Sequence, residues 1–198
     1  MKSLFLVTLA CLLFSGIAGA DEQSKAAYEL AETRLMAEWV GDVDEQYALA
    51  TAYYKGEIVQ QDYAEAFKWY GKAAGQGHMI SQYRLGTMYD KGEGTRRNET
   101  EAFSWYEMAA EQGHASAQLS LGKRYAEGKG VPQNFAEAYV WFNLSAASGN
   151  EEAAAERDRY AGLLSRDGLA EAQRYSMQLF EEIKQRKAKL LVKTTGQR

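Results

Sequence analysis

The two histidines are the residues of this chain whose side chains most readily suggest chemistry. His78 and His114 are the only histidines in the sequence, and each directly follows a glycine. Two imidazoles could contribute to a zinc site. The interval of 36 residues, however, places them at corresponding positions of neighbouring repeats, too far apart to share a metal ion without further ligands. We therefore expect a structural role for both histidines and no metal site.

Carboxylates could supply a general acid and a general base, for example in an enzyme that acts on cell-wall material. The chain contains 27 aspartates and glutamates, but the spacing singles out no pair of them. The sequence also lacks a nucleophile elbow, a phosphate-binding glycine loop and a zinc-binding helix motif. We therefore expect no catalytic residues, no enzymatic activity and no cofactor.

The fold of the chain is expected to follow an internal repeat. One pattern recurs three times, every 36 residues, without insertion or deletion. Its tryptophans are Trp69, Trp105 and Trp141. Three further sets have the same spacing and are expected to hold the repeats together: Leu49, Leu85 and Leu121; Tyr53, Tyr89 and Tyr125; Gly56, Gly92 and Gly128. A period of this length predicts stacked helical units, because each unit needs its neighbours to cover its apolar face.

Each repeat has the pattern of two antiparallel helices. In the middle repeat the first helix is expected from about Ser81 to Lys91, where glycines end it. The second helix is expected to begin at Asn98, an N-cap, with Glu101 completing a capping box. Asp62 with Glu65 and Asn134 with Glu137 repeat this arrangement. The predicted fold class is all-α: an α/α solenoid, with capping helices at both ends.

The N-terminal segment, 1–20, has the composition of a secretory signal peptide. Lys2 precedes the apolar run from Leu4 to Phe14, which is too short to span a bilayer, and Ala18-Gly19-Ala20 provides small residues for cleavage. We expect cleavage between Ala20 and Asp21, which would make the protein exported, either periplasmic or secreted. The alternative, a lipid anchor on Cys11, fits less well because that residue lies inside the apolar run.

The predicted division of the chain follows from these features. It comprises a signal peptide (1–20), an N-terminal capping helix (21–41), three repeats (42–77, 78–113 and 114–149), C-terminal capping helices (150–190) and a basic flexible tail (191–198). The tail could contact anionic lipid or polysaccharide, or it could simply be a solvated end. The formal net charge of −4 gives no reason to expect binding to nucleic acid.

The third repeat resembles the Sel-one-like repeat (SLR) family. The residues that carry the resemblance include Ala117-Gln118-Leu119, Leu121-Gly122, Tyr125, Gly128, Gly130, Asn134, Ala138, Trp141 and Gly149. The resemblance extends over Glu45 to Asn150 and implies a right-handed superhelix of helix-turn-helix repeats, similar to tetratricopeptide repeats, whose first helices line the concave face. Such proteins commonly act as adaptors, and exported bacterial members resemble envelope regulators, host-contact factors or assembly aids. The first repeat departs from the pattern, with Ile58 in place of the second loop glycine.

Partner specificity is expected where the three repeats differ and first-helix residues face outward. The candidates are Arg84, Met88, Lys91, Lys123 and Arg124, which form a basic stripe with Met88 as an apolar contact, and Tyr54. This pattern predicts a protein or peptide partner, possibly an acidic one, along the concave groove. The alternative is a solvated helix face.

Together these features predict a non-enzymatic scaffold or adaptor for protein–protein interaction in the bacterial cell envelope or the secreted space. No transmembrane segment is expected in the mature chain. A cell-wall-active enzyme and a structural assembly aid for an envelope complex are the alternatives.

Overall fold

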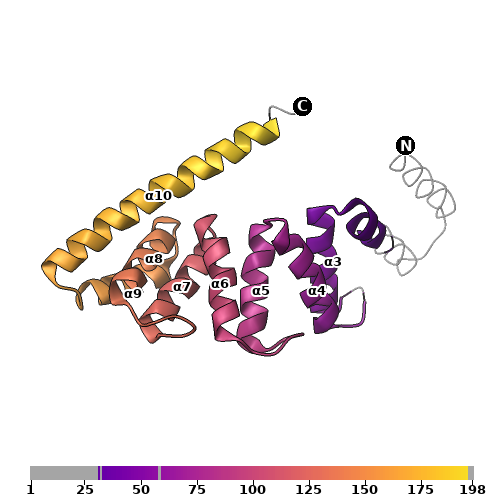
Figure 1. Cartoon of the computed structure of the whole chain (residues 1–198), viewed down its shortest axis with the longest axis horizontal. Coiled ribbons are helices and arrows are strands. Elements are labelled where there is room, and N and C mark those ends of the chain that lie inside the picture. The colour runs from indigo at the N-terminus through magenta and orange to yellow at the C-terminus, as the bar shows by residue number, and fades with distance from the viewer. Residues whose placement is uncertain (1–30, 32, 58, 196–198) are drawn as a thin grey trace. The chain divides into compact units, whose positions relative to one another are not determined.

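The computed structural model describes residues 31, 33–57 and 59–195, and these residues form helices and no strands (Figure 1). The expected all-α fold is therefore confirmed. The signal peptide with its cleavage site at Ala20–Asp21, most of the N-terminal capping helix and Ile58 lie outside the described residues.

Six helices of equal length follow the 36-residue period. The first helices of the repeats are α3 (Val43–Lys55), α5 (Met79–Lys91) and α7 (Ala115–Glu127), and the second helices are α4 (Tyr63–Gly75), α6 (Glu99–Glu111) and α8 (Phe135–Ala147). Each has 13 residues. A short π-helix, η1 (Met36–Val40), precedes them, and α9 (Glu151–Ala161) and α10 (Arg166–Thr195) follow.

The described chain divides into two compact units. Unit 1 contains the described residues up to Ser81 together with Glu93–Thr95, and unit 2 contains Gln82–Gly92 and the residues from Arg96 onward. In unit 1, α3 packs against η1 and α4. In unit 2, α6 to α9 pack in succession, and α10 lies along α8 (Figure 1). None of the described helices is both long enough and apolar enough to cross a membrane.

The histidines act as helix caps, which confirms their expected structural role. His114 is the N-cap of α7, and its Nδ1 accepts a hydrogen bond from the Ala117 N–H at 3.2 Å. His78 occupies the corresponding position before α5 and accepts from the Ser81 N–H at 3.3 Å. The same period continues beyond the histidines, because Asp42 and Asn150 are the N-caps of α3 and α9.

An aromatic side chain covers each histidine. The rings of Tyr83 and His114 stack with centroids 4.5 Å apart, and the rings of Tyr47 and His78 lie 4.8 Å apart. Burial is the main cause that lowers the pKa of each histidine below its ordinary value. Lowering the pKa favours the neutral imidazole, which is the form that can accept a backbone hydrogen bond at Nδ1.

The second helices begin as predicted at side-chain caps, but the capping boxes are absent. Asp62, Asn98 and Asn134 each accept hydrogen bonds from two backbone N–H groups of the first turn. In a capping box, the side chain of the glutamate three residues later would accept a hydrogen bond from the backbone N–H of the cap, and this prediction is wrong. Instead, the N–H of each cap donates to the carbonyl of Tyr53, Tyr89 or Tyr125, at 3.0, 3.0 and 2.8 Å. These carbonyls lie in the last turn of the first helix, where they have no partner within that helix.

The recurring leucines form the centre of the core, whereas the tryptophans differ among the repeats. Leu49, Leu85 and Leu121 are at most 1% exposed. Trp69 and Trp141 are buried as well, but Trp105 is only half-buried. Trp105 is therefore more accessible than its two counterparts.

Pairs of glutamines, one of them buried in each pair, connect successive helices at one end of the repeats. The Gln76 Nε2 donates to the Gln46 Oε1 at 2.8 Å, and the Gln112 Nε2 donates to the Gln82 Oε1 at 2.6 Å. The corresponding pair in the third repeat is Gln118 and Ser148, and there the Gln118 Oε1 is buried without a hydrogen-bond partner. The shorter serine side chain explains this difference.

The final helix is longer than the sequence analysis predicts. The Ser165 Oγ caps it by accepting from the Gly168 N–H at 3.1 Å, and the helix continues to Thr195 rather than ending at residue 190. Residues 191–195 are therefore helical rather than a flexible tail.

Candidate functional site

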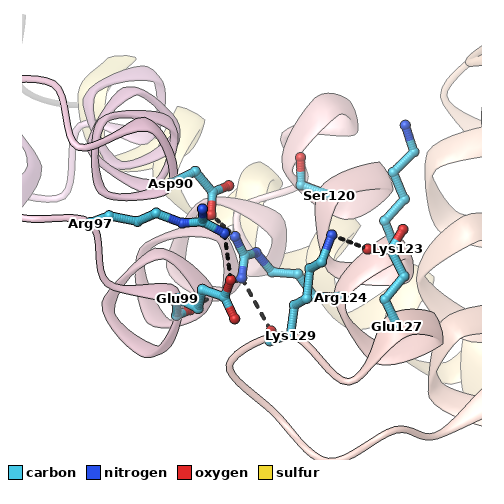
Figure 2. Close-up of a pocket in the computed structure, with 8 residues that line it drawn as sticks. All are labelled: Asp90, Arg97, Glu99, Ser120, Lys123, Arg124, Glu127 and Lys129. Atoms are coloured by element: carbon cyan, nitrogen blue, oxygen red, sulfur yellow. Dashed lines mark hydrogen bonds and ion pairs between the residues drawn. The ribbon is translucent and has the colours of Figure 1, made fainter.

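A charged pocket beside α7 combines two of the predicted binding residues with six others. We call it the α7 pocket; it lies within unit 2 and has a volume of about 390 Å³ (Figure 2). Its lining consists of Asp90, Arg97, Glu99, Ser120, Lys123, Arg124, Glu127 and Lys129. Ser120, Lys123 and Glu127 are spaced i, i+3 and i+7, so they lie on one stripe of α7.

Arg124 is the structural centre of the pocket rather than an outward-facing cation. Its side chain is only 6% exposed and forms an ion pair with Asp90. Its Nη1 donates to the carbonyls of Glu99 and Lys129, both at 3.1 Å. The guanidinium thereby joins the end of α5, the start of α6 and the loop after α7. The expectation that Arg124 faces outward as part of a binding stripe is wrong.

Tyr106 supports the other side of this ion pair. Its hydroxyl donates to the Asp90 Oδ2 at 2.8 Å, and its ring lies under the Arg124 guanidinium at 5.2 Å. Burial raises the pKa of Tyr106 to about 12, so its hydroxyl stays protonated at neutral pH and remains a donor. Burial also lowers the pKa of Arg124, but an arginine stays charged under these conditions. Asp90, Tyr106 and Arg124 together therefore fix the geometry of this side of the pocket.

A glycine allows the loop after α7 to approach α6 closely. Gly130 has a φ of 73°, and a Cβ at this position would lie 2.2 Å from the Glu99 carbonyl oxygen. Any larger residue would push the loop away from α6 and separate the two carbonyls that accept from Arg124. The second loop glycine of this repeat is thus required by packing as well as by its left-handed backbone.

The rim of the pocket carries three cations, each next to a carboxylate. Lys123 pairs with Glu152 of α9 at 2.6 Å, Arg97 pairs with Glu99 at 2.7 Å, and Lys129 pairs with Glu127 at 2.6 Å. The three cationic side chains are between 43% and 65% exposed. Ion pairs this exposed contribute at most about 1 kcal/mol. A carboxylate from a partner could therefore replace the internal one.

The other predicted binding residues lie elsewhere. Met88 is 1% exposed and belongs to the core, so its expected role as an exposed apolar contact is wrong. Arg84 is half-buried and Lys91 is exposed, and neither lines the pocket. Tyr54 is half-buried in unit 1, where its hydroxyl donates to the Glu93 Oε2 at 2.9 Å. Of the six candidates, the structure brings only Lys123 and Arg124 together.

The sequence also indicates that Asp90 and Arg124 form a pair. This becomes apparent only when their two repeat positions are considered together. Arg124 corresponds to Ala52 and Met88, and Asp90 corresponds to Tyr54 and Ala126. Each is therefore the only charged residue at its position in the three repeats, and the two charges are opposite. Two such departures in adjacent repeats indicate a compensating pair, and hence a buried contact rather than an exposed stripe.

Among the described residues, no three histidine, cysteine, aspartate or glutamate side chains come together as a metal site would require.

The Sel1 repeat pattern matches three segments of the chain, residues 46–78, 80–114 and 115–150. These segments cover more than half of the sequence and coincide with the three pairs of helices. The chain belongs to the Sel1 repeat family. Sel1 repeat proteins generally mediate protein–protein interaction and are typically non-catalytic scaffolds. No curated protein matches the chain.

Several solved structures are similar to this Sel1 repeat protein. A Sel1 repeat protein from Oxalobacter formigenes is 37% identical with a TM-score of 0.61, and the match covers 66% of this chain and 98% of that one. A protective antigen of uropathogenic Escherichia coli strains, which displays an SLR fold, is 28% identical with a TM-score of 0.60, over 91% of this chain and 46% of that one.

Cysteine rich protein B of Helicobacter pylori is 20% identical with a TM-score of 0.53, over 70% of this chain and 98% of that one, a similarity of fold alone. Together these similarities confirm the expected α/α solenoid.

Proposed function

We propose that this Sel1 repeat protein is an exported, non-enzymatic scaffold that binds a protein or peptide partner at the α7 pocket. The observation that carries the proposal is the position of a charged pocket on a first helix of a Sel1 repeat, in a family that generally mediates protein–protein interaction. The signal-peptide pattern of residues 1–20 supports export to the periplasm or the secreted space.

The partner contributes acidic side chains to the rim. Arg97, Lys123 and Lys129 provide three exposed cations around one pocket, whereas Arg124 is already held by Asp90. Carboxylates of the partner replace the internal carboxylates in these exposed pairs. Such contacts should weaken with added salt, because exposed charges are screened.

A photo-crosslinking amino acid at Ser120 would test this proposal in intact cells. Ser120 lines the pocket and bears no charge, so the probe leaves the rim cations in place. We expect Lys123→Glu to reduce the yield of the crosslinked partner about fivefold to tenfold, the equivalent of about 1 kcal/mol. Glu127→Lys should increase the yield, because it removes a carboxylate that competes with the partner.

Lys68→Glu is the matched control, because it makes the same charge change at an exposed position of unit 1, where the side chain is 64% exposed. An equal crosslinking yield from wild type and Lys123→Glu would refute the pocket as the binding site. Release of soluble fragments from purified cell wall by the protein would favour the enzymatic alternative. Mass spectrometry of the exported protein should show Asp21 as the first residue, and an intact Met1 would contradict export by cleavage.

A further inference from the structure

The C-terminal end of the chain differs sharply in charge from the rest. From Ile183 to Arg198 the sequence contains six lysines and arginines and no aspartate or glutamate. Because the whole chain has a formal net charge of −4, taking away these six positive charges leaves a charge of −10 on the part before Ile183. An anionic surface would therefore attract this end of the protein and repel the remainder.

Most of these cationic residues lie within the single helix α10. We call residues 184–195 the basic arm; all of them lie within α10. The arm contains Lys184, Arg186, Lys187, Lys189 and Lys193. The side chains of Lys184 and Arg186 are 67% and 52% exposed, and Lys189 is exposed as well.

The preceding part of α10 has a different role, which is to pack against the repeats. Ala172, Ser176, Leu179 and Ile183 are buried, and their spacing of four, three and four residues forms one continuous stripe. Arg186 and Lys187 still contact α6 and the turn after it, through Glu111 at 3.6 Å and the Gly113 carbonyl at 3.3 Å. Leu190, near the continuation of the stripe, is 58% exposed, and Val192 is 71% exposed.

Stabilisation of the C-terminal end of α10 does not account for the number of cations in the basic arm. Cations favour the C-terminus of a helix through the macrodipole, but this effect is limited to the last turn. Lys184 and Lys189 lie one or more turns before the end at Thr195. Lys184 and Arg186 also form ion pairs with Glu181 and Glu182 of the same helix, but pairs this exposed contribute little to stability and account for only part of the run of cations.

We propose that the basic arm binds the surface of an anionic lipid bilayer. A cluster of lysines and arginines on a helix is attracted to anionic headgroups, and the exposed apolar side chains of Leu190 and Val192 suit the boundary between headgroups and acyl chains. Nucleic acid would contact mainly the cations, through its phosphates.

Sedimentation with lipid vesicles would test this inference, using the full protein as exported. The vesicles are phosphatidylcholine alone or phosphatidylcholine mixed two to one with phosphatidylglycerol. A triple variant, Lys184→Gln, Lys189→Gln and Lys193→Gln, should bind the anionic vesicles about 100-fold more weakly, since each cation near the surface contributes about fivefold. It leaves unchanged Arg186 and Lys187, which contact α6 and the turn after it.

The matched control is Arg34→Gln, Lys55→Gln and Lys68→Gln, which removes three exposed cations of unit 1 and should leave vesicle binding within about twofold of wild type. A second variant, Leu190→Ser with Val192→Ser, should weaken the binding that persists in high salt. The inference is overturned if the two triple variants bind alike, if neutral vesicles bind as well as anionic ones, or if soluble polyglutamate binds the arm as tightly as the vesicles.

Discussion

Replacing Ser148 with glutamine should stabilise the protein by completing an interaction that the first two repeats already contain. The Gln118 Oε1 is buried without a partner, although the Gln118 Nε2 donates to the Ala110 carbonyl at 3.2 Å. The backbone at Ser148 has φ −89° and ψ 8°, and at Gln76 it has φ −89° and ψ 6°. A glutamine at position 148 can therefore adopt the conformation of Gln76 and donate to the Gln118 Oε1.

The expected gain follows from two opposing contributions. A hydrogen bond to a buried acceptor contributes roughly 0.5–1.5 kcal/mol, and more when the acceptor would otherwise stay unsatisfied. Ordering the glutamine side chain costs part of about 1.5–2 kcal/mol. The net stabilisation should be about 0.5–1 kcal/mol, which raises Tm by about 1–4 °C in a domain of this size. Thermal unfolding followed by circular dichroism measures this difference, with urea unfolding as a second determination.

Two further variants make the result decisive. Ser148→Met has a side chain of similar length without a donor, and it should give no stabilisation. Gln112→Ser removes the 2.6 Å bond to the Gln82 Oε1, and it should destabilise the protein by about 1 kcal/mol. If Gln112→Ser is destabilised while Ser148→Gln melts no higher than Ser148→Met, the glutamine pairs are not equivalent and the reasoning fails.

Two other predictions concern the α7 pocket and the histidine caps. Arg124→Met should destabilise the protein by about 2 kcal/mol, which is less than for a fully buried pair because Asp90 is 31% exposed. Combining it with Asp90→Asn should recover part of this loss. Additive losses of stability in urea unfolding would contradict the ion pair. Burial, and then the charges of Arg84 and Lys187, lower the pKa of His114 below 6.5 in the folded state. Its contribution to stability is therefore complete above pH 6.5 and is lost as the pH falls through the lowered pKa. His114→Asn keeps a capping side chain, as at Asn150, and should make Tm less dependent on pH between 5 and 7; an unchanged dependence would show that another group is responsible.

The repeat period, the helix boundaries and the capping residues could be predicted from the sequence. These features depend on local chemistry: an asparagine or aspartate caps a helix, a glycine ends it, and a 36-residue recurrence of leucine and glycine requires equivalent helix pairs. The π-helical turn of η1 and the extension of α10 to Thr195 were not predictable in the same way. Gly196 directly follows the extension, but one glycine does not by itself show that residues 191–195 stay helical.

The candidate site shows what the sequence alone determined and what only the tertiary structure decided. The sequence identified the first-helix positions at which the repeats differ, and one of the residues at these positions, Lys123, lines the α7 pocket. Variation between repeats, however, does not distinguish an exposed position from an inter-helix position that each repeat fills differently. Met88 and Arg124 occupy the same position of their repeats, and both are buried: Met88 belongs to the hydrophobic core, and Arg124 pairs with Asp90. Only the packing of α5, α6 and α7 determines which cations are neutralised inside the protein and which stay exposed on the rim, because that depends on residues far apart in the chain.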